Sequence, residues 1–317
     1  MGTPRFLVTG GAGFIGSNLA DELIRRGAKP ILIDNFATGF RENLDEIAGD
    51  FEFVEGDISD RELLAKILPG IDTVFHQAAL PSVPRSVADP AETHKACVDA
   101  TFDLLLAARD AGVRRFVYAA SSSAYGDQPT LPKVETMRPD PLSPYAAAKL
   151  TGEHYCRVFS QVYGLETVSL RYFNVFGPRQ NPSSQYSGVI SRFIDAFMRG
   201  GTPVIYGDGE QTRDFTFVAN VVDANIKASE TDKGIGEVMN VANGERISLN
   251  DLVEVMKKIS GRDDVVADFQ PERKGDVKHS QADNRKAIEC LGYTKLVGLE
   301  EGLVRTIDWW KSSRFSK

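Results

Sequence analysis

The chain has 317 residues, of which 42% are hydrophobic and 26% charged, an ordinary composition for a globular protein of one large domain or two modest ones. The formal net charge is −7 without a Lys/Arg-rich run, so neither nucleic acid nor an anionic membrane is an expected partner. No apolar run approaches the roughly 18 residues of a membrane span, and no targeting motif precedes the first predicted strand. Three scattered cysteines without metal-like spacing predict a cytoplasmic protein with no metal site.

A glycine-rich turn follows the first predicted strand. Residues 5–9 form the short apolar run of a buried parallel strand, and a helical pattern follows Gly16. Gly10, Gly13 and Gly16 are spaced three apart. Because these positions lack side chains, the backbone can turn sharply and approach a pyrophosphate at the helix N-terminus. The turn therefore predicts a dinucleotide site.

The next strands end in residues suited to the adenosine half of that dinucleotide. Asp34 closes the strand at residues 30–34, 18 residues after Gly16, where an acid can bind both ribose hydroxyls. A carboxylate there repels a 2′-phosphate, so NAD is predicted rather than NADP. The strand at residues 51–58 ends in Asp57 and Ile58, a pair expected to flank the adenine.

The fourth predicted strand, residues 72–79, ends in two small residues, Ala78 and Ala79, which let the chain pass close to a cofactor. His76 within it is interpreted as a packed or hydrogen-bonded residue rather than a catalyst. Strands and helices alternate in this part of the chain. That order predicts an α/β protein with a doubly wound parallel sheet, the Rossmann fold.

Hydroxyl groups and a Tyr–Lys pair mark the middle of the chain. A fifth strand from residue 115 leads to the serines at 121–123, at the end of the strand that faces the ligand crevice. Ser143 as N-cap and Pro144 at the first position predict a helix to about residue 163. Tyr145 and Lys149 are four residues apart on one face of it. An ammonium beside a phenol favours the phenolate, which would make Tyr145 a usable base.

In combination, the glycine turn, Asp34, the serines before Tyr125, the Tyr–Lys pair and the segment at residues 171–178 resemble the extended short-chain dehydrogenase/reductase family. The resemblance covers nearly the whole chain. It implies a catalytic unit of Ser121, Tyr145 and Lys149, with Ser122 and Ser123 beside it. The NAD-binding residues that it implies are Gly10, Gly13, Phe14, Ile15, Gly16, Asp34, Asn35, Asp57, Ile58, Gln77, Ala78, Ala79, Tyr145, Lys149 and Tyr172.

Three further segments, at residues 76–86, 207–215 and 273–283, are similar to nucleotide-sugar 4-epimerases, especially those acting on UDP-N-acetylhexoses. This similarity implies inversion at C4 of a UDP-hexose through a transient 4-keto sugar, with UDP-glucose and UDP-galactose also possible substrates. A small Ser280 implies room for an N-acetyl group, and two arginines suit a diphosphate. The implied substrate-binding residues are Ser82, Val83, Arg85, Ser123, Asn174, Gln180, Val189, Tyr206, Arg213, Arg273, Asp276 and Ser280.

Other functions within and outside this family stay open. UDP-glucuronate 4-epimerisation, a dehydratase activity and a different oxidation at C4 are alternatives. Dehydration is disfavoured because Ser122 and Ser123 cannot protonate a leaving hydroxyl as a carboxylic acid would. A non-catalytic NAD-sensing protein is disfavoured because the Tyr–Lys pair is present.

The predicted domain plan has two lobes. Residues 1–177 form the NAD-binding domain, to which about 208–236 return, and residues 178–317 form a smaller α/β lobe that binds the UDP-sugar. Strands at 203–206 and 237–242 and a helix capped by Ser248 are expected in that smaller lobe. A homodimer through a four-helix bundle is expected from the helices at about 90–111 and 144–163.

Overall fold

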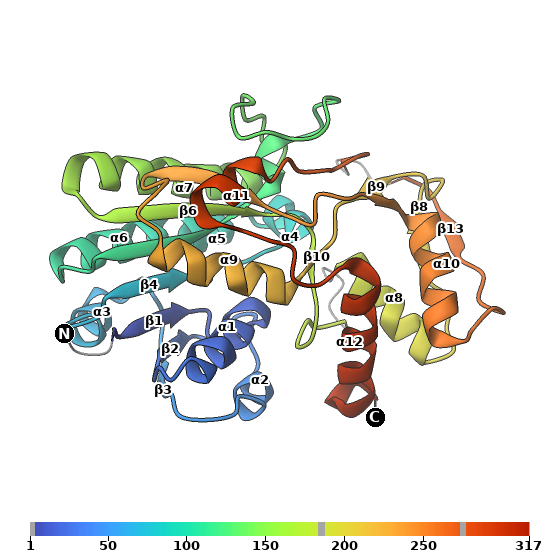
Figure 1. Ribbon diagram of the computed structural model, residues 1–317, viewed down its shortest axis with the longest axis horizontal. Coiled ribbons are helices and arrows are strands. Elements are labelled where there is room, and N and C mark those ends of the chain that lie inside the picture. Colours follow the sequence, from blue (N-terminus) through green and yellow to red (C-terminus); the bar gives the residue numbers. More distant parts are fainter. Residues whose placement is uncertain (1–3, 183–187, 273–276, 317) are drawn as a thin grey trace.

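The computed structural model describes residues 4–182, 188–272 and 277–316. Its centre is a parallel sheet of seven strands in the order β11-β6-β5-β4-β1-β2-β3 (Figure 1). The predicted doubly wound α/β fold is therefore confirmed. The strands are β1 (Phe6–Thr9), β2 (Ile31–Asp34), β3 (Glu52–Glu55), β4 (Thr73–His76), β5 (Arg115–Ser121), β6 (Glu166–Tyr172) and β11 (Glu237–Val241).

Strand β1 is the centre of this sheet. It pairs in parallel with β2 on one side, through Leu7 and Ile31, and with β4 on the other, through Leu7 and Val74. The chain builds β2 and β3 on one side of β1 and then crosses to β4 on the other side. The connections leaving β1 and β4 therefore diverge, and a crevice opens at the carboxyl ends of these two strands.

Successive side chains of β1 point to opposite faces of the sheet. Val8 belongs to a buried cluster with α1 (Phe14–Arg25) and α9 (Val218–Glu230). Leu7 belongs to a second cluster with α3 (Arg61–Ile67), α6 (Ala100–Asp110) and α7 (Pro144–Tyr163). Both faces of the sheet are thus covered by helices, which explains why its strands read as continuous apolar runs.

The helix expected at residues 90–111 is present but is not a regular α-helix. It consists of α5 (Pro90–His94), a π-helical segment (Lys95–Asp99) and α6. The Thr101 hydroxyl donates a hydrogen bond to the carbonyl of Cys97 within this segment, at 2.9 Å. Such π turns recur at functional sites, and this one faces the cofactor crevice described below.

The remaining elements lie toward one end of the molecule (Figure 1). Three short strand pairs join β7 (Val175–Phe176) to β10 (Thr216–Phe217), β9 (Thr212–Arg213) to β12 (Ile247–Ser248), and β8 (Val204–Tyr206) to β13 (Asp268–Gln270). The predicted cap of α10 (Leu249–Ser260) is confirmed, since Ser248 accepts a hydrogen bond from the Asp251 amide at 3.0 Å. The helices there are α8 (Val189–Met198), α10 and α12 (Leu299–Ser312), while α2 (Arg41–Asp45), α4 (Val83–Ala88) and α11 (Arg285–Leu291) lie elsewhere.

The prediction that residues 237–242 belong to the smaller lobe is wrong. Strand β11 pairs in parallel with β6, with Met239 opposite Leu170, and forms the edge of the central sheet. Met239 and Val241 are fully buried. The apolar residues of β11 therefore extend the central sheet beside β6. The two strands are about 70 residues apart along the chain, so the local sequence pattern does not encode their pairing.

In the described part of the chain, no helix has the length and apolarity to cross a membrane.

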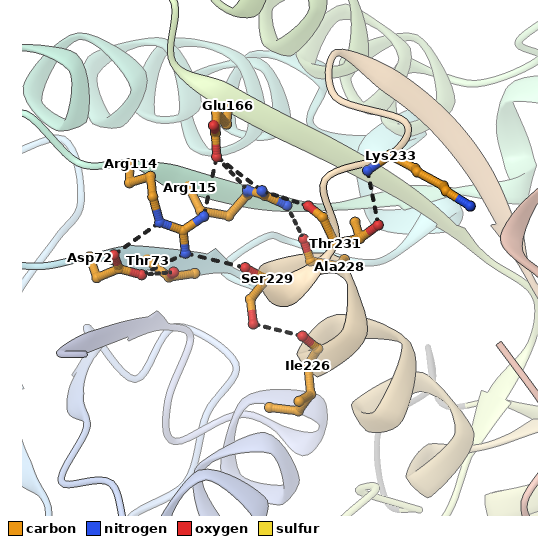
Figure 2. A network of polar contacts seen from close by, with 10 residues as sticks. All are labelled: Asp72, Thr73, Arg114, Arg115, Glu166, Ile226, Ala228, Ser229, Thr231 and Lys233. Carbon is orange, nitrogen blue, oxygen red and sulfur yellow. Dashed lines mark hydrogen bonds and ion pairs between the residues drawn. The ribbon is translucent and has the colours of Figure 1, made fainter. Parts of the chain in front are cut away.

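A polar network closes the end of the sheet opposite the crevice (Figure 2). Arg115 is 1% exposed, and its guanidinium donates to the carbonyls of Ala228 and Thr231 and to the Glu166 carboxylate. It thereby satisfies carbonyls at the C-terminal end of α9, where a positive charge also suits the helix dipole. Its neighbour Arg114 pairs with Asp72 but has a side chain 46% exposed.

Replacing Arg115 is expected to destabilise the fold. The variant Arg115→Met leaves two carbonyls without their donor, so the free energy of unfolding should fall by about 2–3 kcal/mol. Urea denaturation followed by circular dichroism measures this loss. The matched variant Arg114→Met breaks a more exposed ion pair and should cost less than about 1 kcal/mol. Equal losses in both variants would contradict the assigned role of Arg115.

Candidate active site

A cavity of about 240 Å³ lies at the carboxyl ends of β1, β2 and β4. Many of the residues predicted to bind NAD line it, namely Gly10, Asp34, Asn35, Asp57, Ile58, Ala78 and Ala79. The π-helical segment supplies Lys95 and Ala96 to the opposite wall, and neither was predicted. Their contribution depends on the extra residue of the π turn, which has no clear sequence signature.

The glycine turn has the close packing expected of a dinucleotide cradle. Gly10 has a φ of 68°, and a Cβ there would lie 2.9 Å from the Ala78 nitrogen. A Cβ at Gly16 would lie 2.1 Å from the Gly10 carbonyl oxygen. Gly13 is the N-cap of α1, so the first amides of that helix, at Phe14 and Ile15, follow it directly. Because such amides have no partner within a helix, they suit a pyrophosphate.

Two carboxylates that were predicted to contact adenosine line this cavity, Asp34 and Asp57. Asp34 is 7% exposed and accepts hydrogen bonds from the amides of Ala12 and Phe36, at 3.0 and 2.7 Å. Burial raises the pKa of Asp34, and these two hydrogen bonds oppose the rise. The Asp57 carboxylate accepts a hydrogen bond from the side-chain amide of Asn35 at 2.7 Å. Burial opposes ionisation of Asp57 as well, but hydrogen bonds and the charge of Lys95 outweigh it and lower its pKa.

The helix α7 brings the predicted catalytic residues to the end of β5. Ser143 accepts a hydrogen bond from the Ala146 amide at 3.2 Å, which confirms the predicted start of the helix. Tyr145 lies in the first turn, with its side chain close enough to Ser121 for that residue to lower its pKa. Lys149 is buried one turn later and donates from Nζ to the Ala119 carbonyl at 2.8 Å. The hydroxyl groups of Ser121 and Ser123 are hydrogen-bonded to each other, with 2.8 Å between their oxygens. Ser122 begins the short 3₁₀ turn that follows β5.

The expectation that Lys149 lowers the pKa of Tyr145 is not met. Burial raises the pKa of Tyr145 above its ordinary value, the nearby Cys97 adds to the rise, and only Ser121 opposes it. The Lys149 ammonium is bound to the Ala119 carbonyl and lies 4.9 Å from the centre of the Tyr118 ring. Burial also lowers the pKa of Lys149. Burial therefore disfavours the phenolate form of Tyr145.

Two predicted cofactor residues meet in a buried amide network beneath the crevice. The Tyr172 hydroxyl donates to Gln77 Oε1 at 3.1 Å, and Gln77 Nε2 donates to Asn225 Oδ1 at 2.9 Å. Asn225 was not predicted, although a buried asparagine within the apolar α9 is a signal that could have found it. His76 is fully buried, with ring nitrogens 2.8 Å from the Thr9 hydroxyl and 2.9 Å from the Thr101 hydroxyl. Its interpretation as a hydrogen-bonded strand residue is confirmed.

A second cavity, of about 210 Å³, collects residues predicted to bind substrate: Asn174, Gln180, Val189, Tyr206 and Arg213. The Arg213 Nη1 donates to the carbonyls of Thr212 and Lys278, which positions its guanidinium at the wall. Arg192 and Gln211 also line the cavity and were missed. Arg192 follows Val189 by one helical turn and Gln211 lies within the segment 207–215, so helix spacing and the motif itself could have found them.

Asn174 joins this cavity to the predicted gatekeeping residue. It has a φ of 35°, a conformation that asparagine tolerates better than most residues. Its Nδ2 donates to the Asp214 carbonyl at 3.1 Å and to the Ser280 hydroxyl at 3.2 Å. Ser280 therefore lies beside the cavity, although it is 106 residues away along the chain.

Three other predicted substrate residues, Ser82, Val83 and Arg85, do not line either of these two cavities. Ser82 caps α4 and accepts from the Arg85 amide, while the Arg85 side chain pairs with Glu92 at 2.7 Å. Val83 is 38% exposed on the same helix, which packs against α7. Arg273 and Asp276 fall outside the described residues. Within the described residues, no group of three or more potential ligands is arranged to hold a metal ion.

A glycine cradle, an acid at the end of the second strand and a Ser–Tyr–Lys set at the end of β5 and the start of α7 define an NAD-dependent enzyme with a Rossmann fold. Residues 6–242 match the sequence profile of the NAD dependent epimerase/dehydratase family, and the chain belongs to this family. Its cofactor is NAD.

The similarity to individual members extends over almost the whole chain. A UDP-glucose 4-epimerase of Mycolicibacterium smegmatis is 40% identical over 97% of this chain and 99% of its own length. The structure of a UDP-N-acetylglucosamine 4-epimerase from Methanobrevibacter ruminantium, in complex with UDP-N-acetylmuramic acid, is 40% identical, with a TM-score of 0.93 over 98% of this chain and 99% of the other. The UDP-glucose 4-epimerase of Thermus thermophilus in complex with NAD is 35% identical, with a TM-score of 0.87 over 98% and 99% of the two chains. These relatives place the protein among enzymes of the UDP-sugar 4-epimerase type.

Proposed function

We propose that the protein interconverts UDP-N-acetylglucosamine and UDP-N-acetylgalactosamine by inverting C4, and that it also accepts UDP-glucose and UDP-galactose. The observation that carries this proposal is the contact between Ser280 and Asn174 at the substrate cavity. A small side chain at that wall leaves room for an N-acetyl group beside the sugar ring. The Ser–Tyr–Lys set at the end of β5 and the start of α7 supplies the chemistry at C4.

In the proposed reaction, Tyr145 takes the proton of the sugar 4-hydroxyl and later returns it. Ser121 lies close to Tyr145 and shares that proton. NAD, held by the glycine cradle and Asp34, would supply reversible hydride chemistry at C4. Between the two transfers the 4-keto sugar rotates about its diphosphate link. The chain thus returns to its starting state after each turnover.

Lys149 has a positioning part in this proposal. Its contact with the Ala119 carbonyl fixes the first turns of α7 on β5. Because burial raises the pKa of Tyr145, proton abstraction requires positive charge close to the phenol. An oxidised nicotinamide ring would supply such charge, and Lys149, whose ammonium is held by the Ala119 carbonyl, suits the nicotinamide ribose hydroxyls.

A rotating sugar requires a firmly held nucleotide. We propose that the elements after residue 178 outside the central sheet, including α8, β8 and β9, form the lobe that binds UDP. Arg213 and Arg192 line its cavity and can neutralise the diphosphate. Binding energy from this remote end then retains the reactive keto sugar during its rotation.

The proposed activity is tested by incubating the purified protein with UDP-N-acetylglucosamine, without added cofactor, and resolving the sugars by chromatography. Formation of UDP-N-acetylgalactosamine is the expected result. Stoichiometric NADH without an epimer would instead indicate a dehydrogenase. The same experiment with UDP-glucuronate tests the alternative substrate.

We further propose a homodimer in which two helices from each copy form a four-helix bundle: the helix that runs from α5 through the π-helical segment to α6, and α7. Tyr155, Val158 and Val162 are spaced by three and four residues along α7 and are 36%, 45% and 65% exposed. Such spacing forms one apolar stripe suited to a helix partner. The Phe102 ring of α6 packs against Tyr155, with centroids 5.0 Å apart, and extends the stripe.

Charge placed in this stripe is expected to separate the dimer. The double variant Val158→Glu/Val162→Glu should raise the dimer dissociation constant by at least roughly a hundredfold, because both carboxylates would be buried without partners. Analytical ultracentrifugation measures this change. Val304→Glu is the matched control, since Val304 on α12 is 41% exposed outside the stripe. A double variant that still sediments as the wild type would refute the proposed interface.

A further inference from the structure

One buried carboxylate lies between two residues that line the substrate cavity, Arg213 and Phe215, and is not assigned a role by the proposed reaction. Asp214 is 0% exposed and lies in the short connection between β9 and β10. Its pKa is raised to about 7 by burial, which three backbone hydrogen bonds oppose. A fully buried carboxylate is costly to maintain, so its contacts merit a functional explanation.

The three hydrogen bonds come from two separate segments. Asp214 Oδ1 accepts from the Asn243 amide at 3.0 Å, and Oδ2 accepts from the amides of Gly244 and Ala282 at 3.1 and 3.0 Å. Asn243 and Gly244 follow β11 of the central sheet. Ala282 lies in the segment 278–283, which also carries Ser280. The carboxylate therefore ties the connection after β9 to the central sheet and to the Ser280 segment.

The main chain of the same residue extends these ties into the cavity. The Asp214 carbonyl accepts from Asn174 Nδ2, and that amide also donates to the Ser280 hydroxyl. Arg213, the preceding residue, lines the cavity and donates to the Lys278 carbonyl at the start of the Ser280 segment. Asp214 is thus bonded, directly or through one neighbour, to the residues proposed for diphosphate binding and for sugar selection.

We propose that Asp214 is a positioning residue that fixes Arg213 and Ser280 relative to one another, and so sets both substrate affinity and the choice between N-acetylated and unsubstituted sugars. It does so without touching the substrate. The reacting groups Ser121, Tyr145 and Lys149 lie on β5 and α7, outside this set of bonds. Its loss should therefore affect binding and selectivity more than the chemical step. This inference rests on the proposed epimerase function.

The variant Asp214→Asn tests the proposal with little change in shape. An amide nitrogen replaces one acceptor oxygen and faces a backbone N–H as a second donor, so at least one of the three bonds is lost. The KM for UDP-N-acetylglucosamine should rise roughly tenfold, with kcat at saturation within about threefold of the wild type. The ratio of kcat/KM for the N-acetylated over the plain substrate should also change by roughly threefold or more.

Two controls separate positioning from general destabilisation. Asp72→Asn makes the same substitution at the opposite end of the sheet, where Asp72 pairs with Arg114 (Figure 2). It should lower the melting temperature while leaving KM and the substrate ratio unchanged. The amount of NAD bound per chain should equal that of the wild type in both variants. A changed NAD content in Asp214→Asn alone would overturn the proposal, because the cofactor cavity lies outside the bonds of Asp214.

The outcomes distinguish this inference from the function on which it rests. A wild-type protein that epimerises no UDP-sugar refutes the proposed function. An active wild type together with wild-type KM and substrate ratio in Asp214→Asn refutes the positioning role alone. If that variant does not fold, Asp214→Glu, which keeps the charge but displaces it by one methylene, must show the same rise in KM.

If neither variant folds, hydrogen exchange on the wild-type protein decides. The amides of Gly244 and Ala282 should then become more protected when UDP-N-acetylglucosamine is added, because substrate contacts with Arg213 and Ser280 hold the same set of bonds closed. Unchanged protection of both amides would overturn the proposal.

Discussion

A Tyr145→Phe protein should lose epimerase activity by at least roughly a thousandfold in kcat, since no other group in the set can take the 4-hydroxyl proton. Ser121 contributes only a neutral hydroxyl, and Lys149 is a buried cation bound to the Ala119 carbonyl. The change removes one oxygen and leaves the packing of the ring in place. Steady-state conversion of UDP-N-acetylglucosamine, followed by chromatography, measures the loss.

The control for this variant lies on the same helix. Tyr163→Phe makes an identical change at a residue that is 50% exposed at the end of α7, and it should leave kcat unchanged. Both proteins should keep the NAD content of the wild type. Near wild-type conversion by Tyr145→Phe would remove Tyr145 from the reaction and with it the proposed mechanism.

The second large effect is expected for selectivity. Ser280→Tyr places a ring where the Ser280 hydroxyl now lies 3.2 Å from Asn174 Nδ2, and the ring should fill the space proposed for the N-acetyl group. Turnover of UDP-N-acetylglucosamine should fall by roughly a hundredfold or more in kcat/KM, because the larger substrate then meets a steric clash. Turnover of UDP-glucose should stay within about threefold of the wild type.

A variant at the same position isolates the effect of size. Ser280→Ala removes the hydrogen bond to Asn174 but keeps the side chain small, so the N-acetylated substrates should still be converted. Parallel kcat/KM measurements with UDP-N-acetylglucosamine and UDP-glucose decide the matter. Equal losses for both sugars in Ser280→Tyr would count against a gatekeeping role and would indicate a damaged site instead.

Features that depend only on residues nearby in the sequence could be predicted well. The cradle of Gly10, Gly13 and Gly16 and the capped start of α7 at Ser143 follow from backbone freedom and from helix capping, which act over a few residues. The same is true of the pairing of Tyr145 with Lys149, because the two residues are one helical turn apart. Resemblance to a family then supplied the partners of these residues from distant parts of the chain.

Features that depend on the surroundings of a group could not be predicted in this way. Burial is the main cause that raises the pKa of Tyr145, and the Lys149 ammonium one turn away does not lower it. The Lys149 ammonium is directed to the Ala119 carbonyl by the packing of α7 on β5. Likewise, Lys95 reaches the cofactor cavity through a π turn, and Asn225 reaches Gln77 from a helix almost 150 residues later.

The sequence by itself determined the class of fold, the dinucleotide cradle, the preference for NAD and the Tyr–Lys pair, because these rest on short-range geometry and on residue types at set spacings, while Ser121 joined that pair through the resemblance to a family. Only the tertiary structure decided that β11 completes the central sheet, that Ser280 meets Asn174, and that Asp214 binds three backbone amides. Such contacts join segments brought together by sheet pairing and burial. Their energies depend on the surrounding packing and dielectric, which no local stretch of sequence specifies.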